Sequence, residues 1–298
     1  MNIDANTGGL GRFKGEIVAP PRSAPLGTLV ILTTVAFFIV LPLLARLPDG
    51  PNLSSLTMIG GPRLGYAVVV WTMVLVVAAF SVNDVNAKTL AVMVFAFIIS
   101  LAGAALIGRS MKPTVFPVIY MMAPAIFVTL VSAIPGLGGG LGWLRIGRFS
   151  PRLSIAVAAL AAISIATLVG YVLTLKPDLT QQPLIASHRF GVLSLLLVGI
   201  CIAALNAAVE EAIYRGIVMN ALDAALGPGW WSVILQAAAF GTFHFNSTEP
   251  GVAGVVLTAM LGLVLGTLRR VGRGMGPNYL LHVAIDIGVW TLGMTQLR

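Results

Sequence analysis

The segment 206-NAAVEEAIYRGIVMNAL-222 places two adjacent glutamates and an arginine, Glu210, Glu211 and Arg215, between long apolar runs. The chain has 298 residues, of which 58% are hydrophobic and only 9% are charged. A soluble domain carries about 25% charged residues, so most of this chain must face lipid. The sequence therefore predicts an all-α, polytopic bundle of transmembrane helices, in which every charge inside a span requires a reason.

Apolar runs of spanning length, roughly 17–25 residues each, recur along the whole chain. Links rich in Pro, Gly, Asn and Asp, which favour turns, separate them. We expect about eight or nine spans. The candidate runs, the seventh of them short, lie near residues 27–46, 64–82, 88–108, 114–134, 153–175, 190–222, 231–246, 251–268 and 277–296.

The positive charge is spread over the links between these runs. The net charge is +8, from 18 Lys and Arg against 10 Asp and Glu. No basic patch stands out, so nucleic-acid binding is not expected. Lys and Arg are more frequent in the links that are inner when the N-terminus is cytoplasmic, including residues 269–273. We expect a multi-pass protein of a bacterial inner membrane with a polar cytoplasmic tail over residues 1–26.

Two smaller features bear on packing. Cys201 is the only cysteine, which excludes an internal disulfide, and we expect it to be a small buried side chain. Gly262 and Gly266 form a G-x-x-x-G motif, which permits close helix contact. We expect this contact within one molecule, with association between molecules as the alternative. The sequence does not indicate an oligomeric state.

Acids and histidines inside the apolar runs occur only in the last third of the chain. Glu210 lies 13 residues before Asp223, His244 lies 13 residues after Trp231, and Asp286 lies 13 residues after Arg273. Each separation is roughly 20 Å along a helix. His282 and Asp286 are four residues apart and share a helix face. We therefore expect carboxylates and histidines from separate helices to meet in one layer. A structural polar network that ties the helices together is the alternative interpretation.

Three motifs carry a resemblance to a known family. They are "EEAIYR" (210–215), "FGTFH" (240–244) and "HVAID" (282–286), or E-E-x-x-x-R, F-x-x-x-H and H-x-x-x-D. In this order, on successive apolar helices, they resemble the intramembrane proteases of the CAAX-protease and bacteriocin-processing (CPBP, Abi) family. The resemblance covers roughly residues 190–298.

The resemblance implies an intramembrane endopeptidase that hydrolyses a peptide bond of a membrane-associated protein or peptide. It divides the chain into the tail 1–26, accessory transmembrane helices over 27–152 and a protease core over 153–298, with the motifs inside 206–290. It implies the following roles: Glu210 as the base that activates water, helped by His244; His282 and Asp286 as the pair that holds the oxyanion; Glu211 and Arg215 as orienting residues; Phe240 as a wall of the pocket. Peptide hydrolysis needs these functions on general chemical grounds.

Metal dependence is open at this stage. Glu210, His244, His282 and Asp286 are all residue types that bind zinc, and three protein ligands plus water form the catalytic pattern. The H-E-x-x-H motif is absent, and we favour a metal-free glutamate mechanism without a cofactor. Many members of the family have Asn where this chain has Asp286. An ionised Asp would repel an oxyanion, so it must be protonated, pair with His282 or bind metal.

Two functions from other classes use the same residues. Intramembrane carboxylates also mark ion and proton paths, which would make the protein a transporter or channel. A non-catalytic immunity or scaffold protein is the other alternative. The sequence does not indicate the substrate: a prenylated C-terminus, a leader peptide and a sorting-signal tail all fit.

Overall fold

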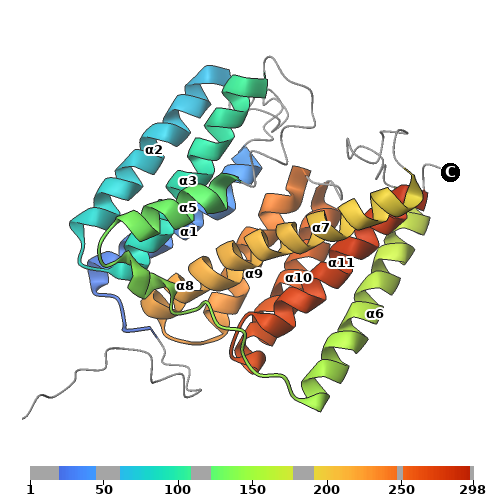
Figure 1. The fold of residues 1–298 in the computed structure, drawn as a ribbon. Helices are drawn as coiled ribbons and strands as arrows, with labels where there is room; N and C mark the ends of the chain where they lie inside the picture. Colours follow the sequence, from blue (N-terminus) through green and yellow to red (C-terminus); the bar gives the residue numbers. More distant parts are fainter. Residues whose placement is uncertain (1–19, 45–60, 109–121, 177–190, 247–250, 296–298) are drawn as a thin grey trace, which may run out of the picture.

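The fold is known from a computed structural model, which describes residues 20–44, 61–108, 122–176, 191–246 and 251–295 (Figure 1). Every regular element in these residues is helical, as the composition predicts. The predicted tail over 1–26 lies mostly outside the described residues. The helices are α1 (Pro25–Leu44), α2 (Gly61–Ser81), α3 (Val85–Gly108), α5 (Met122–Ala133), α6 (Pro151–Leu175), α7 (Val192–Glu211), α8 (Met219–Leu226), α9 (Trp230–Phe243), α10 (Gly251–Gly272) and α11 (Gly276–Thr295).

These helices fall in all nine predicted apolar runs. Among the described residues, four helical segments are long and apolar enough to cross a bilayer, and three shorter apolar helices accompany them. The four segments are Pro25–Leu43, Pro151–Leu175, Val192–Leu226 and Gly251–Gly272. The protein is therefore an integral membrane protein with a helical bundle. The count of eight or nine spans and the cytoplasmic N-terminus stay predictions.

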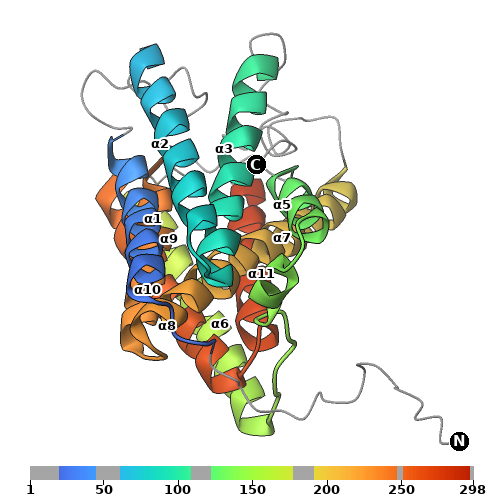
Figure 2. The same cartoon turned by 90° about the vertical axis from the view of Figure 1, so that its left-hand side faces the viewer.

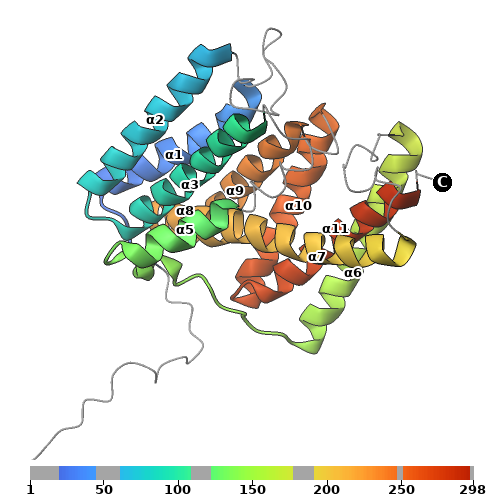
Figure 3. The same ribbon diagram turned by 45° about the horizontal axis from the view of Figure 1, so that its top comes forward.

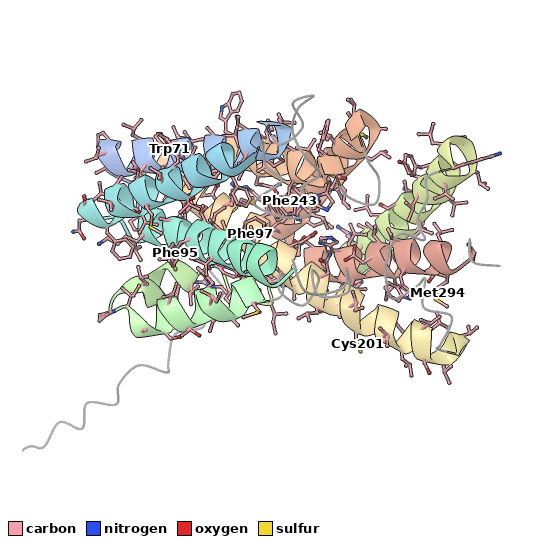
Figure 4. All side chains as sticks on the ribbon, turned by 90° about the horizontal axis from the view of Figure 1, so that it is seen from above. Trp71, Phe95, Phe97, Cys201, Phe243 and Met294 are labelled. Atoms are coloured by element: carbon pink, nitrogen blue, oxygen red, sulfur yellow. The ribbon has the colours of Figure 1, made fainter. Side chains whose placement is uncertain are left out.

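The first helices share one hydrophobic core with α8 and α9, and α10 and α11 form a second, smaller one. Helix α1 lies along α9, and α2 and α3 pack beside it, whereas α6 flanks α11 on the opposite side (Figure 2, Figure 3). Phe38 of α1 stacks on Phe243 of α9 with ring centroids 6.4 Å apart. Phe97 of α3 meets Phe243 edge-on at 5.5 Å, and the two rings point toward each other in the middle of the bundle (Figure 4). The predicted accessory helices thus support α9, which ends one residue before His244.

The G-x-x-x-G motif packs within the molecule. A Cβ atom at Gly262 would lie 2.9 Å from the Cα atom of Ala237 on α9, so the two backbones approach too closely for a larger residue. Gln236 of α9 donates a hydrogen bond of 2.8 Å to the carbonyl oxygen of Gly262. The intramolecular interpretation is confirmed, and the motif holds α9 and α10 together.

The expectation for Cys201 is wrong. Its side chain is exposed on the outer side of α7 (Figure 4). In a membrane protein, lipid-facing and buried positions are both apolar, because lipid tails are as apolar as a protein core. An apolar neighbourhood in the sequence therefore cannot distinguish the two positions.

Candidate active site

The two glutamates stand where the backbone changes its helical geometry. Helix α7 ends at Glu211 and continues directly into a π-helix, Ala212–Val218, which leads into α8. A π-helix is a wider turn that costs stability and often occurs at functional sites. The sequence predicts one uniform α-helix here, because Glu211 and Arg215 are four residues apart, and the structure has a π-helix instead. The change places Tyr214 and Arg215 in a wide turn, where both are fully buried.

Glu210 lies between the Nε2 atoms of two histidines. Its Oε1 atom is 3.8 Å from Nε2 of His244, at the end of α9, and its Oε2 atom is 3.4 Å from Nε2 of His282, on α11. Only 5% of the Glu210 surface is exposed. Three helices that are distant in sequence thus bring a carboxylate and two imidazoles together, as their equal depth predicts.

Hydrogen bonds fix which nitrogen of each histidine faces Glu210. Nδ1 of His244 lies 2.8 Å from the carbonyl oxygen of Phe240, and Nδ1 of His282 lies 2.8 Å from Oε1 of Glu211. A carbonyl oxygen and a carboxylate can only accept, so each Nδ1 carries the proton. The Nε2 atom of each histidine therefore faces Glu210.

Asp286 occupies the next turn of α11. Its Oδ1 atom lies 3.6 Å from Nε2 of His282, and its Oδ2 atom accepts a hydrogen bond of 3.1 Å from Nδ2 of Asn206 on α7. Asn206 therefore determines the orientation of the Asp286 carboxyl group. One oxygen of Asp286 is held by α7, and the other faces the same imidazole nitrogen as Glu210.

Glu211 and Arg215 form a buried ion pair next to these groups. Nη1 of Arg215 donates to Oε1 of Glu211 over 2.8 Å, and 1% or less of either residue is exposed. Nδ2 of Asn278, in the first turn of α11, donates to Oε2 of Glu211. Glu211 thus receives hydrogen bonds from Arg215, Asn278 and His282, which hold it in one orientation.

Phe240 packs against Arg215 of the ion pair and against both histidines. The guanidinium carbon of Arg215 lies 4.2 Å from the centre of the Phe240 ring, a cation–π distance. The same ring meets His244 edge-on at 4.6 Å and His282 at 5.8 Å. Phe240 therefore limits the rotation of both imidazoles.

One oxygen of Glu210 has no hydrogen bond. Oε2 of Glu210 is buried and lacks a hydrogen-bond partner in the described part of the chain, because its contact with His282 does not have hydrogen-bond geometry. An unpaired buried acceptor is costly and uncommon in folded proteins. Its presence beside two imidazole nitrogens is typical of a reactive site.

Four residues of the site are of the types that bind metal ions. Glu210, His244, His282 and Asp286 supply the donor atoms that zinc prefers. Within the described ranges, no three His, Cys, Asp or Glu side chains are arranged to hold a metal ion. The Asp286→Asn variant tests metal dependence directly.

Two residues of this cluster were missed in the sequence. Asn206 lies four residues before Glu210, and Asn278 lies four residues before His282. Residues four apart share a helix face, so both asparagines could have been found by extending each motif by one turn. An uncharged amide costs less free energy inside a membrane span than a charge does, so the asparagines did not stand out as candidate site residues.

One comparison with known proteins identifies a family. Residues 192–288 match the family model described as "Type II CAAX prenyl endopeptidase Rce1-like". The matched segment contains all seven of the predicted site residues and both asparagines. No curated protein and no solved structure shows a significant match.

Proposed function

We propose that this integral membrane protein is a peptidase of the CAAX-protease type with Glu210 as its catalytic base, because residues 192–288 match the family model of Rce1-like type II CAAX prenyl endopeptidases. The observation that carries the proposal is the position of Glu210 between two Nε2 atoms, with one buried oxygen that has no hydrogen-bond partner among the described residues. The substrate would be a membrane-associated protein or peptide.

The distance between Glu210 and His244 suits a bridging water. Two hydrogen bonds of about 2.8 Å each can span the 3.8 Å between Oε1 of Glu210 and Nε2 of His244. Because Nδ1 of His244 carries the proton, its Nε2 atom accepts. Both acceptors can therefore hold the protons of the water and leave an oxygen lone pair for attack. Glu210 takes one proton as the oxygen bonds to the scissile carbonyl carbon.

His282 and Asp286 face the position where negative charge develops. In the imidazolium form both nitrogens donate, so His282 can hold Glu211 through Nδ1 and donate from Nε2 to the oxyanion. A protonated Asp286 can donate to the same oxyanion. When the C–N bond breaks, Glu210 transfers its proton to the leaving nitrogen. The products are a carboxyl terminus and an amine, and the carboxylate of Glu210 is restored.

Asp286→Asn distinguishes the metal-free mechanism from a metal mechanism. Asp donates a hydrogen bond only when protonated, whereas Asn donates at every pH. Asn206 can still donate to the amide oxygen, which turns the new NH2 group toward His282. We expect the variant to retain activity and to extend it to higher pH. The measurement is a pH–rate profile of both forms in liposomes, with elemental analysis of the same samples.

A metal mechanism makes the opposite prediction for this variant. Asn is a poorer ligand than a carboxylate, so zinc content and rate should fall together. A joint loss of zinc and activity would overturn the metal-free mechanism and leave the protease assignment intact.

The proposed activity is tested by comparing protein termini in membranes from cells that carry either the wild type or Glu210→Ala. We expect a set of new termini in or beside transmembrane segments that depends on Glu210. Insertion and amount of both proteins are measured by immunoblot of the membrane fraction. Identical termini in both samples, with equal amounts of protein, would favour a transport or scaffold function instead.

A further inference from the structure

A second cluster of charged residues surrounds a cavity at one end of the bundle. The cavity has a volume of about 270 Å³ and is bounded by α3, α8, the end of α10 and the segment that leads into α6. These elements meet at the same end of the molecule (Figure 1, Figure 2). Asp223 lines the cavity and lies 13 residues after Glu210, roughly 20 Å along the helix. None of the seven predicted site residues lines this cavity.

The cavity is strongly basic. Its lining contains four arginines, Arg145, Arg269, Arg270 and Arg273, and one aspartate, which makes its formal charge +3. Arg270 has a structural role, because it pairs with Asp223 and donates to Ser232 and to the carbonyl oxygen of Gly229. Asp223 also attracts Arg269, so two arginines share this one carboxylate.

Arg269 and Arg273 are not part of the hydrogen-bonded pair of Arg270 and Asp223. Nε of Arg269 is buried and has no hydrogen-bond partner among the described residues. The side chain of Arg273 is exposed, and its backbone adopts the left-handed conformation, with φ of 54°. That conformation costs a non-glycine residue about 1–2 kcal/mol. The cavity thus has beside it the buried Nε atom of Arg269, which lacks a hydrogen-bond partner in the described ranges. It also has the exposed side chain of Arg273, whose backbone is strained.

Backbone hydrogen bonds hold the cavity wall in place. The amide of Arg148 donates to the carbonyl oxygen of Gly272, and the amides of Met275 and Gly276 donate to the carbonyl oxygens of Arg145 and Ile146, each over 2.7 Å. The segment before α6 is therefore bound along the link between α10 and α11. Because the wall is formed by the protein alone, the arginines are positioned before any ligand arrives.

We propose that this cavity binds a phosphate group, carried either by an anionic phospholipid or by a soluble phosphate ester. Guanidinium groups bind phosphate through paired, charge-assisted hydrogen bonds. The volume is slightly below the roughly 300–1,000 Å³ of sites for drug-sized molecules, so it suits a small headgroup. Basic pockets between helices at the membrane surface are typical sites for anionic headgroups. An oxygen of the bound phosphate would accept a hydrogen bond from Nε of Arg269, which has no other acceptor among the described residues.

The test measures ligand retention by the full-length protein in detergent, by native mass spectrometry. The probes are phosphatidylglycerol, a diacylglycerol with the same acyl chains, and glycerol 3-phosphate. We expect retention of phosphatidylglycerol above diacylglycerol, and a loss of about fivefold in affinity for each of Arg269→Gln and Arg273→Gln. Arg152→Gln is the matched control, because Arg152 is exposed at the start of α6 and does not line the cavity.

The probes distinguish the two sources of phosphate. Binding of phosphatidylglycerol that glycerol 3-phosphate does not displace identifies a lipid site, and arginine-dependent binding of glycerol 3-phosphate identifies a soluble ligand. Equal retention of phosphatidylglycerol and diacylglycerol, without binding of glycerol 3-phosphate, would overturn the proposal. A loss with Arg152→Gln as large as with Arg273→Gln would also overturn it. Because Arg273 is exposed, its variant keeps the test valid if Arg269→Gln fails to fold.

Discussion

Glu210→Gln lowers the cleavage rate by about 10²–10⁴-fold, the range that general acid–base catalysis contributes. Gln keeps the size of the side chain but cannot take a proton from water. The rate is measured from the appearance of the Glu210-dependent termini after the purified wild type or variant is added to membranes that lack the protein. Glu210→Asp, which keeps the carboxylate but shortens the side chain, is the matched comparison and should retain part of the activity.

Stability separates this loss from misfolding. Glu210 is buried, and its Oε2 atom has no hydrogen-bond partner in the described residues. Replacing a buried, incompletely paired carboxylate by a neutral amide should leave the melting temperature in detergent unchanged or raise it. An inactive variant with an unchanged melting temperature supports a catalytic role. An active Glu210→Gln protein would refute the glutamate-base mechanism.

Arg215→Met destabilises the protein by about 3–5 kcal/mol, because it leaves the charge of Glu211 buried without its ionic partner. Both residues of the pair are 1% exposed or less. The measurement is the free energy of unfolding, or the shift in melting temperature, in one detergent for all variants. Arg152→Met is the matched control: Arg152 is exposed, and its replacement should change stability by less than about 0.5 kcal/mol.

The double variant Glu211→Gln/Arg215→Met should recover much of this loss, because it removes both charges. The amide oxygen of the introduced glutamine can still accept from Nδ1 of His282. The side chain of Asn278 can turn so that its Oδ1 atom, which has no hydrogen-bond partner in the described residues, accepts from the new amide. If Arg215→Met alone leaves the stability unchanged, the pair is not ionic in the folded bundle.

The position of the reactive layer could be predicted from the sequence, and its hydrogen bonds could not. Glu210, His244 and Asp286 were placed at one depth because a helix rises by a constant 1.5 Å per residue. Asn206 and Asn278 were missed, although each lies one turn before a predicted residue. Their partners, Asp286 and Glu211, come from a different helix in each case. Such pairs depend on how each helix is rotated about its axis.

The order of the amino acids is sufficient to establish that this chain forms membrane helices, and which of them carry the polar groups. Lipid offers no hydrogen bonds to the backbone, so long apolar runs without alternating polar residues must form helices. Which face of each helix is buried depends instead on the packed bundle. The packing leaves Cys201 on the outside, and it brings Phe38 against Phe243. Apolar side chains suit lipid and protein equally, so helix packing, rather than hydrophobicity, selects these contacts.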